Sequence, residues 1–414
     1  METRIGAARV MVAIAAAAAL MTAQMLPAWA ADGDLDPSFD GDGKVTTAFA
    51  GGAAARAVAV QSDGGIVAAG VAGSDFGLAR YGTEGALDPA FGSGGKVTTS
   101  IIGAGEARAV ALQPDGMIVA AGTADDRNRF AVVRYDTGGT PDPGFGTGGV
   151  VTTDLTPGFD IANGVAIQPD GKILVAGSAG TNRPKFALVR YGTDGTPDPT
   201  FGDGGLVITP YGIWGVARAL ALQSNGKIVL AGGNGGSWAL ARYTPEGELD
   251  PVFGGDGKVT SPLFGDAFAV AVQSDGRIVA AGAFDFFRFA AARFTKAGRP
   301  DRTFSGDGRV TTDVRHGSEQ VAEAVAIQHD GRIVVAGGAG PHEVVEPIEW
   351  RFAIVRYRAN GVLDHGFGGD GRATTRFVGG AYAHGASLSG GRLLVVGGAG
   401  PGNAGRFALA RYRV

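Results

Sequence analysis

The sequence predicts an all-β fold, namely a seven-bladed β-propeller built of four-stranded antiparallel blades. Three observations lead to this prediction: a turn motif returns seven times, four short apolar segments separate successive copies, and no segment shows a sustained helical period with caps. The copies are spaced roughly 54 residues apart, a period typical of propellers and solenoids. Four strands in each of seven units favour closure into a ring, which leaves no exposed sheet edge.

The composition excludes several classes of protein. Glycine accounts for 73 of the 414 residues, while 45% of the residues are hydrophobic and 18% are charged. This chain is too apolar to be disordered, and its glycines do not recur at every third position as in collagen. The net charge of -4 offers no basic excess for phosphates, so nucleic acid is not an expected partner. Cysteine is absent, which excludes disulfides and thiolate metal sites.

The first thirty residues predict a secretory signal peptide. Arg4 and Arg9 precede an apolar run over residues 10–21, and Ala28 and Ala30 supply the small residues of a cleavage site. The alternative is a membrane anchor, but the run is shorter than the ~20 apolar residues that span a bilayer. We therefore expect a secreted protein with no stable membrane insertion after cleavage, in which residues 31–414 form a single propeller domain.

The turn motif marks the boundary between the third and fourth strands of each unit. It combines an aspartate with a phenylalanine three residues later, and the last two copies are degraded. The seven copies are Leu35–Phe39, Leu87–Phe91, Pro141–Phe145, Pro197–Phe201, Leu249–Phe253, Pro300–Phe304 and Leu363–Phe367.

Four strands are visible within one unit. The second unit contains four strand-like segments, at residues 96–99, 108–113, 117–121 and 130–135. Asp115-Gly116 joins the second and third segments, and this dipeptide predicts a two-residue type I′ hairpin. A β-helix is the structural alternative, but its coils use shorter repeats and its turns do not require Asp-Gly hairpins.

Side-chain size predicts the order of strands within a blade. The Ala-Val-Ala strands carry the smallest residues and should lie innermost, whereas the polar Lys-Val-Thr-Thr strands should lie outermost. The mature chain begins with an outer strand at residues 44–48 and ends with a third strand at residues 406–412. The N-terminal strand is therefore expected to complete the last blade and close the ring.

The repeat resembles the delta-60 repeat family of exported bacterial proteins. The resemblance rests on residues 164–177, where Val-Ala-Ile-Gln precedes Asp-Gly-Lys-Ile, and on Phe-Ala-Leu-Val-Arg-Tyr at residues 186–191. It covers essentially the whole mature chain and implies an exported, propeller-like protein. The family supplies no catalytic residues to transfer. The last unit departs most, with Ser-Leu-Ser-Gly-Gly at residues 387–391 where the family pattern has Ile-Gln-x-Asp-Gly.

Residues that return in every unit are expected to be structural. One arginine and one aspartate recur seven times, which predicts one charge-assisted pair per blade, with a ring of ligand sites as the alternative. One phenylalanine also recurs and should pack between blades. The repeat arginines are Arg80, Arg134, Arg190, Arg242, Arg293, Arg356 and Arg411; the repeat aspartates are Asp36, Asp88, Asp142, Asp198, Asp250, Asp301 and Asp364; the repeat phenylalanines are Phe39, Phe91, Phe145, Phe201, Phe253, Phe304 and Phe367.

Residues that differ between units indicate where function lies. When strands are counted from the innermost strand of a blade, the turns between the first and second strands and between the third and fourth strands are regular. Both open on one face, here called the regular face. The other connections differ in every copy and open on the opposite, variable face, which is the predicted functional face because irregular loops on a rigid scaffold usually carry recognition. The candidate ligand-binding residues are His316, His342, Glu343, His384, Tyr382, Trp214 and Trp350.

The three histidines of this set are expected in variable loops around the sixth blade. Three histidines with neighbouring carboxylates could ligate a metal or supply acid–base chemistry, whereas solvated loop histidines are the simpler interpretation. We predict a secreted, non-catalytic binding propeller with no cofactor, whose partner is a polysaccharide, a peptide or a cell-surface protein. The alternative is an extracellular hydrolase, lyase or lactonase that uses the His/Glu cluster.

Overall fold

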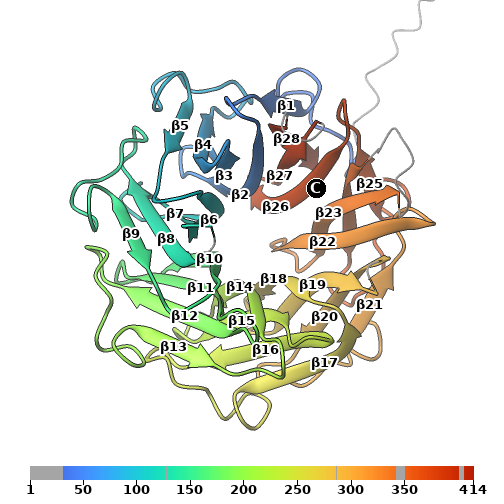
Figure 1. Cartoon of the computed structure of the whole chain (residues 1–414). Helices are drawn as coiled ribbons and strands as arrows, with labels where there is room; N and C mark the ends of the chain where they lie inside the picture. Colours follow the sequence, from blue (N-terminus) through green and yellow to red (C-terminus); the bar gives the residue numbers. More distant parts are fainter. Residues whose placement is uncertain (1–30, 127, 286, 342–349, 401–404) are drawn as a thin grey trace, which may run out of the picture. The chain divides into compact units, whose positions relative to one another are not determined.

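Seven β-sheets surround a common axis in the computed structural model, which describes residues 31–414 except 127, 286, 342–349 and 401–404. These residues form one compact unit (Figure 1). Each sheet has four antiparallel strands, so the predicted seven-bladed propeller is confirmed. No helix long and apolar enough to cross a membrane occurs in the described part of the chain. The predicted signal peptide at residues 1–30 lies outside the described residues.

The 28 strands of the described residues fall into four positions within the blades, from the axis outward. The inner strands are β2 (Ala53–Val60), β6 (Glu106–Leu112), β10 (Asp160–Ile167), β14 (Val216–Leu222), β18 (Ala267–Val272), β22 (Ser318–Ile327) and β26 (Ala381–Ser389). The second strands are β3 (Ile66–Ala72), β7 (Ile118–Ala124), β11 (Ile173–Ala179), β15 (Ile228–Gly233), β19 (Ile278–Phe284), β23 (Ile333–Pro341) and β27 (Arg392–Ala399). The third strands are β4 (Asp75–Tyr81), β8 (Arg129–Tyr135), β12 (Lys185–Tyr191), β16 (Ser237–Tyr243), β20 (Arg288–Phe294), β24 (Arg351–Tyr357) and β28 (Arg406–Arg413). The outer strands are β5 (Lys96–Thr99), β9 (Val150–Thr153), β13 (Leu206–Thr209), β17 (Lys258–Phe264), β21 (Arg309–Thr312), β25 (Arg372–Thr375) and β1 (Lys44–Thr47).

The ring closes as predicted. Blades one to six follow the chain order, and blade seven has the order β1-β28-β27-β26. The N-terminal strand β1 pairs antiparallel with the C-terminal strand β28, with Lys44 opposite Ala410 and Thr47 opposite Phe407. The first and the last strand of the described residues thus share one sheet (Figure 1).

The Asp-Gly hairpins differ from the prediction. A type I′ turn needs positive φ at both central residues, but in the first blade only Gly64 has it, at 88°. The turn instead spans Gln61–Gly64, in which the Gly64 amide donates to the Gln61 carbonyl at 3.0 Å. Aspartate stays in the ordinary region and its carboxylate accepts the Gly65 amide at 2.9 Å. The hairpin is therefore longer than the predicted two-residue loop, and the glycine alone provides the left-handed residue.

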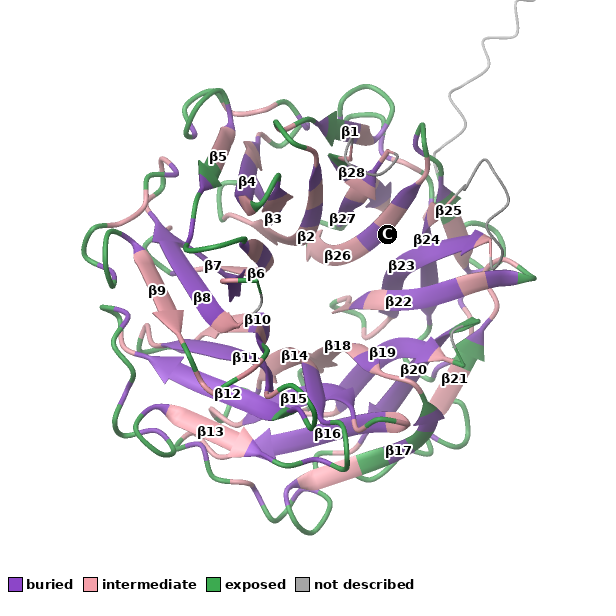
Figure 2. Cartoon of the chain, in the orientation of Figure 1, coloured by how far each residue is buried: buried purple, intermediate pink, exposed green. Residues whose placement is uncertain are grey.

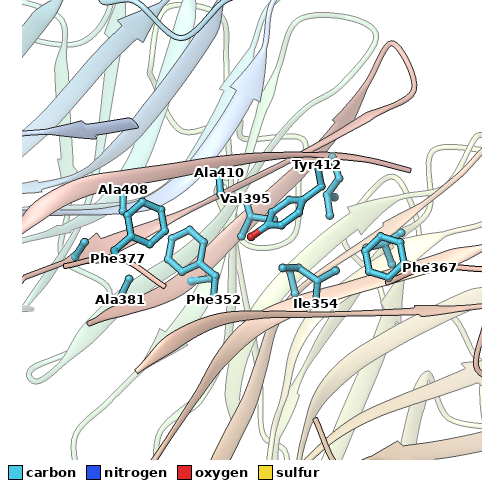
Figure 3. Packing of buried hydrophobic residues seen from close by; sticks show 14 residues of the cluster. Phe352, Ile354, Phe367, Phe377, Ala381, Val395, Ala408, Ala410 and Tyr412 are labelled. Carbon is cyan, nitrogen blue, oxygen red and sulfur yellow. The ribbon is translucent and has the colours of Figure 1, made fainter. Parts of the chain in front are cut away.

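The hydrophobic core lies between adjacent blades. The second and third strands are almost entirely buried, while the inner strands are partly exposed toward the axis (Figure 2). Between blades six and seven, Phe352 and Ile354 of β24 pack with Val395 of β27 and Ala408 of β28 (Figure 3). Six equivalent clusters join the remaining pairs of neighbouring blades. Each blade is therefore stabilised by both of its neighbours.

The repeat arginines and aspartates form one ion pair in every blade, as predicted. In blade four, Arg242 Nη2 lies 2.7 Å from Asp250 Oδ2, with both side chains buried. The seventh pair, Arg411 with Asp36, joins the two ends of the chain at 3.0 Å. The other five pairs are equivalent. These residues are scaffold, because the same contact recurs in all seven blades.

Each repeat arginine also contacts further groups. Its guanidinium lies over the repeat phenylalanine, at 4.7 Å from the ring centroid for Arg242 and Phe253, and the other six blades match. In six blades it also donates to a backbone carbonyl of the next blade, such as that of Lys296 for Arg242, whereas Arg356 donates to the Asp32 carboxylate. The phenylalanines lie in the clusters between blades, so this prediction is also confirmed.

The repeat aspartates titrate below their ordinary range. Burial alone would raise the pKa of Asp36, but hydrogen bonds from Arg392 and Ser38 outweigh it and lower the pKa from 3.8 to about 2. The pKa values of the other six repeat aspartates are lowered as well. All seven carboxylates are thus stabilised as anions by the fold.

Candidate functional site

A β-bulge occurs at the same point of every inner strand. In β2, Ala55 pairs with Gly70 and Ala57 pairs with Ala69, so Arg56 has no partner across the strand pair. The other six inner strands shift register at the equivalent place. The bulged residues, here called the bulge ring, are Arg56, Arg108, Asn163, Arg218, Phe268, Glu323 and His384.

Glycine on the facing strand makes room for each bulge. A Cβ atom added to Gly70 would collide with the backbone oxygen of Ala54, because the bulge brings the two strands together at this point. The same collision would occur at the equivalent glycine of every blade, such as Gly177 in blade three. The repeat therefore specifies the bulge through this glycine, and it leaves the side chain of the bulged residue unspecified.

All seven side chains of the bulge ring line one cavity on the propeller axis. The cavity has a volume of about 490 Å³, within the range of small-molecule sites. Its other lining residues, apart from Glu106, are glycine, alanine, valine and leucine, such as Val58 and Ala109. A polar ring thus sits on an apolar collar, and the polar side chains that line the channel are those of the ring and Glu106.

Two arginines of the ring share one carboxylate. Arg56 Nε donates to Glu106 Oε1 at 2.6 Å, and Arg108 Nη2 donates to Glu106 Oε2 at 3.1 Å. Arg108 also donates to Asn163 Oδ1 at 3.2 Å. The Glu106 carboxylate therefore bridges the bulged arginines of blades one and two, and Arg108 extends the contact to Asn163 of blade three.

His384 lies next to Arg56. Arg56 Nη1 donates to His384 Nε2 at 2.6 Å, and since arginine has no acceptor the imidazole nitrogen must accept. Burial and the charges of Arg56 and Arg108 hold the pKa of His384 well below its usual range. The histidine is thus neutral, and its accepting nitrogen is occupied by an arginine.

Glu323 forms the acidic side of the channel. The Tyr382 hydroxyl donates to Glu323 Oε1 at 3.1 Å, and no cation lies within ion-pair distance of Glu323 among the described residues. Burial raises the pKa of Glu323, while the charges of Arg218, Arg56 and Arg108 act in the opposite direction. Burial and the Glu323 charge also raise the pKa of Tyr382, so Tyr382 serves as a hydrogen-bond donor and not as a base.

Two other rings lie beside Tyr382, whose hydroxyl contacts Glu323. The Tyr382 ring lies 4.9 Å from that of Trp350 and 4.9 Å from that of His384, measured between centroids. In the neighbouring blade, the Phe268 ring lies 5.3 Å from the Arg218 guanidinium. Arg218 is itself paired with Asp266 at 2.9 Å and therefore adds no net charge to this sector.

The structure brings together three of the seven predicted site residues, namely Trp350, Tyr382 and His384. The expectation that His384 lies in a variable loop is wrong, because it lies within the inner strand β26, as does Tyr382. The bulge turns the His384 side chain toward the channel, where it is one of the lining residues.

The other predicted site residues are not part of this cluster. His316 is fully exposed between β21 and β22 and contacts Asp313 at 3.0 Å. Trp214 is exposed in the loop before β14. His342 and Glu343 lie outside the described residues. No group of three His, Cys, Asp or Glu side chains that could hold a metal occurs in the part of the chain that the structure describes.

Sequence reasoning missed six members of the bulge ring because it looked for function in loops. The sequence does carry a signal for them: each ring residue stands directly before the Ala-Val-Ala segment of its unit or the equivalent of that segment. Within that otherwise repetitive strand, this position holds arginine, asparagine, phenylalanine, glutamate or histidine. The signal therefore lies at a strand position and not in a loop.

Comparison with known proteins identifies the class of repeat. Six segments match the family model described as a domain of unknown function (DUF5122) beta-propeller; they are residues 61–91, 113–145, 168–201, 223–253, 273–304 and 328–367. Each segment begins at the glutamine after an inner strand and ends at a repeat phenylalanine. The chain thus carries propeller repeats of this kind, while the delta-60 resemblance stays a prediction. All seven bulge-ring residues lie outside the matched segments.

The similar solved structures have low sequence identity to this chain. A catalytically inactive virginiamycin B lyase from Staphylococcus aureus, solved with quinupristin, is 11% identical with a TM-score of 0.52, covering 89% of this chain and 98% of that chain. The polysaccharide lyase Uly1 is 13% identical with a TM-score of 0.44, covering 88% and 91%. A glucose dehydrogenase is 13% identical with a TM-score of 0.43, covering 73% and 95%. No curated protein matches the sequence. The likeness to the virginiamycin B lyase shows the propeller fold alone.

Proposed function

We propose that this protein is an exported, non-catalytic binding module that recognises its ligand at the mouth of the central channel on the variable face. The observation that carries the proposal is the bulge ring, in which one position of a repeated strand holds different side chains that converge on one cavity. A scaffold position would repeat in type, as the ion pairs of the repeat arginines do.

The chemistry of the ring suits recognition. It offers guanidinium, amide, carboxyl, imidazole and phenyl groups above a collar of small apolar residues. Binding sites commonly combine an apolar lining with a few polar groups that fix orientation. The inner strands start on the variable face. In six of the seven, the bulged residue lies closer to the start of the strand than to its end, so these bulges lie toward the variable face.

The test is a binding screen with residues 31–414 on glycan and peptide arrays, followed by titration of any ligand found. Arg108→Gln, which removes one charge from the channel, should weaken binding at least about tenfold, because hydrogen bonds to charged groups contribute about 1.5–3 kcal/mol. Lys296→Ala is the matched control, since Lys296 lines a cavity of the same volume, about 490 Å³, between blades four and five on the regular face. Binding that is lost in Lys296→Ala and kept in Arg108→Gln would refute the proposed site.

A second candidate function is a hydrolase or lyase that uses Glu323. The observation in its favour is the raised pKa of Glu323, which suits a group that transfers protons in a cavity. The virginiamycin B lyase shares the fold, but at 11% identity it supports no activity for this chain. Turnover of a polysaccharide or lactone by the wild-type protein, abolished in Glu323→Gln, would favour the enzyme over the binding module.

A further inference from the structure

The wall of the central channel changes from polar to apolar along the axis. The inner strands run from the variable face to the regular face, so the residues that follow each bulge lie deeper in the channel. The two residues after each ring residue line the same cavity and are glycine, alanine, valine or leucine, such as Ala219 and Leu220 after Arg218. These residues are the apolar collar. A ligand that enters from the variable face therefore passes the polar ring before it reaches the collar.

The inner strands stay apolar below the cavity. In six of the seven blades the next two residues are alanine followed by valine, leucine or isoleucine, such as Ala221 and Leu222, and all of these are partly exposed. The stretch from Ala219 to Leu222 spans about 13 Å of extended strand. In the same stretch of the described inner strands, Ser387 of blade seven is the one polar residue. A hydrocarbon chain along the axis would therefore lie against an apolar wall, where its removal from water is favourable.

Two arginines of the ring keep unused hydrogen-bond donors. Arg56 donates from Nε to Glu106 and from Nη1 to His384, and its Nη2 has no hydrogen-bond partner among the described residues. Arg218 donates from Nε and Nη2 to Asp266, and its Nη1 has none within the same residues. Each of these guanidinium groups already has a carboxylate partner, so it offers a ligand hydrogen bonds without requiring a second anionic group.

Glu323 supplies the complementary acceptor. It belongs to blade six, whereas Arg56 and Arg218 belong to blades one and four, so the three groups approach the channel from different directions. The Tyr382 hydroxyl donates to Glu323 Oε1 at 3.1 Å, and no other hydrogen bond to this carboxylate occurs in the described structure. A carboxylate has about four lone-pair sites, so Glu323 can accept further donors. Burial raises the pKa of Glu323, and a donor from a ligand would stabilise its anionic form.

Hydroxyl groups match the donors and the acceptor of the ring, because a hydroxyl can donate to a carboxylate and accept from a guanidinium. A sugar carries several hydroxyls that point in different directions, which suits donors and an acceptor that are spread over three blades. A single carboxylate group would address the arginines alone, and a single ammonium group would address Glu323 alone.

We infer that the channel binds an amphiphile of the glycolipid class, with its sugar head at the bulge ring and its hydrocarbon tail along the apolar collar. The inference rests on the proposed function and names the ligand class of the same site. The cavity of about 490 Å³ lies within the range of small-molecule sites, and the apolar wall continues below it. The order of the two surfaces fixes the orientation, because the tail must enter first while the sugar stays toward the variable face.

Isothermal titration of residues 31–414 with octyl glycosides tests the inference, at concentrations below those at which the probes form micelles. The glucoside, galactoside and mannoside are compared first, and the tightest head is then measured with butyl, hexyl and octyl tails. The affinity should rise about fourfold for each added methylene, as expected when a methylene is buried in an apolar environment. Octanol, octylamine and octanoate lack the sugar, and each should bind at least about tenfold more weakly than the octyl glycoside.

Two variants separate the head from the tail. Glu323→Gln removes the charge of the acceptor and should weaken all glycosides at least about fivefold, while the increase per methylene stays. Val270→Thr places a hydroxyl in the collar and should weaken the octyl glycoside at least about fivefold, while the preference for the glycoside over octylamine stays. Glu319→Gln is the matched control, because Glu319 lies in the same strand as Glu323 but does not line the cavity, and it should change the affinity by less than about twofold.

Equal affinities of the butyl and octyl glycosides would overturn the inference, as would binding of octylamine or octanoate as tight as that of the octyl glycoside. The absence of glycoside binding at millimolar concentration would overturn it as well. If an array ligand still depends on Arg108 in any of these cases, the proposed binding function stands and only the ligand class fails. If no ligand depends on Arg108, both fail.

Discussion

Deletion of Asp32–Ala50 should destabilise the entire propeller, because these residues supply the outer strand of the last blade. The segment contains β1, whose loss would expose the edge of β28. It also contains Phe39, which is fully buried, and Val45, which is 8% exposed. A disordered extension of the same length could be removed with little effect.

The expected loss can be estimated from the contacts. Two buried apolar side chains of this kind contribute about 1.5–3 kcal/mol each. Asp36, which is 1% exposed, pairs with Arg411, and removal of one partner of a buried pair costs about 3–5 kcal/mol. The total of about 6–11 kcal/mol is comparable with the 5–15 kcal/mol by which native domains are stable. The midpoint of thermal unfolding should therefore fall by at least about 10 °C, if a cooperative transition survives.

The assay is thermal and urea unfolding of residues 31–414 and 51–414, followed by circular dichroism. A point variant separates core packing from the other contributions: Phe39→Ala should cost about 3–5 kcal/mol. Val378→Ala, at a side chain that is 98% exposed, should stay within about 0.5 kcal/mol. If 51–414 melts at the same temperature as 31–414, β1 does not close the ring and the reasoning fails.

Three further predictions concern processing, acid stability and the bulge. N-terminal sequencing of exported protein should find Ala31 as the first residue, and a start at Met1 would contradict the signal peptide. Because the pKa of Asp36 is depressed from 3.8 to about 2 and the other repeat aspartates shift the same way, their stabilisation is present above about pH 4 and is lost as the pH falls toward 2. Urea unfolding at a series of pH values should show this decline, and a stability independent of pH in this window would contradict it. Gly177→Ala should cost about 3 kcal/mol by clashing with the bulge, whereas Asn163→Ala in the bulge itself should cost about 1 kcal/mol or less, as compared by urea midpoints.

The sequence allowed the architecture to be predicted because each blade position has its own type of segment. Alanine-rich strands fit only near the axis, and polar Val-Thr-Thr strands fit the rim. Since the first predicted strand, at Lys44, is a rim strand and the last, which ends near Arg413, is a third strand, the pairing of β1 with β28 followed from the order of the strands alone. The repeat arginines and aspartates could be predicted as structural because they recur in all seven units.

The geometry of the hairpin between the inner and second strands was not predictable from the Asp-Gly dipeptide alone. Asp-Gly fits a two-residue type I′ turn, but it also fits the longer turn observed here, in which Gly64 alone is left-handed. The choice depends on the strand ends: Val60 pairs with Ile66, which leaves residues 61–65 for the loop. Register of this kind is set by packing between strands and is not encoded in the turn residues alone.

The channel was missed for a different physical reason. A strand with strict alternation sends every second side chain to the same face, and by that rule the ring positions fall among the residues that contact a neighbouring blade. The bulge inserts one residue and redirects it to the axis, which no alternation pattern reports. Arg56, Glu323 and His384 therefore looked like isolated polar residues of a small apolar strand.

The bulge also explains how a sevenfold repeat can hold a site with no sevenfold symmetry. The fold requires the glycine opposite the bulge, because a Cβ at Gly70 or its equivalents would collide with the inner strand. The bulged residue itself pairs with nothing in the ladder, so its side chain is constrained by the channel and by the neighbouring blade, as where Asn163 donates to the Ala217 carbonyl at 2.8 Å. Each blade can thus carry a different group at this point without a change in its hydrogen bonds to the next strand. Four consecutive blades carry four chemically different side chains at this point, namely those of Arg218, Phe268, Glu323 and His384. This variety is expected where the ligand, and not the fold, selects the residue.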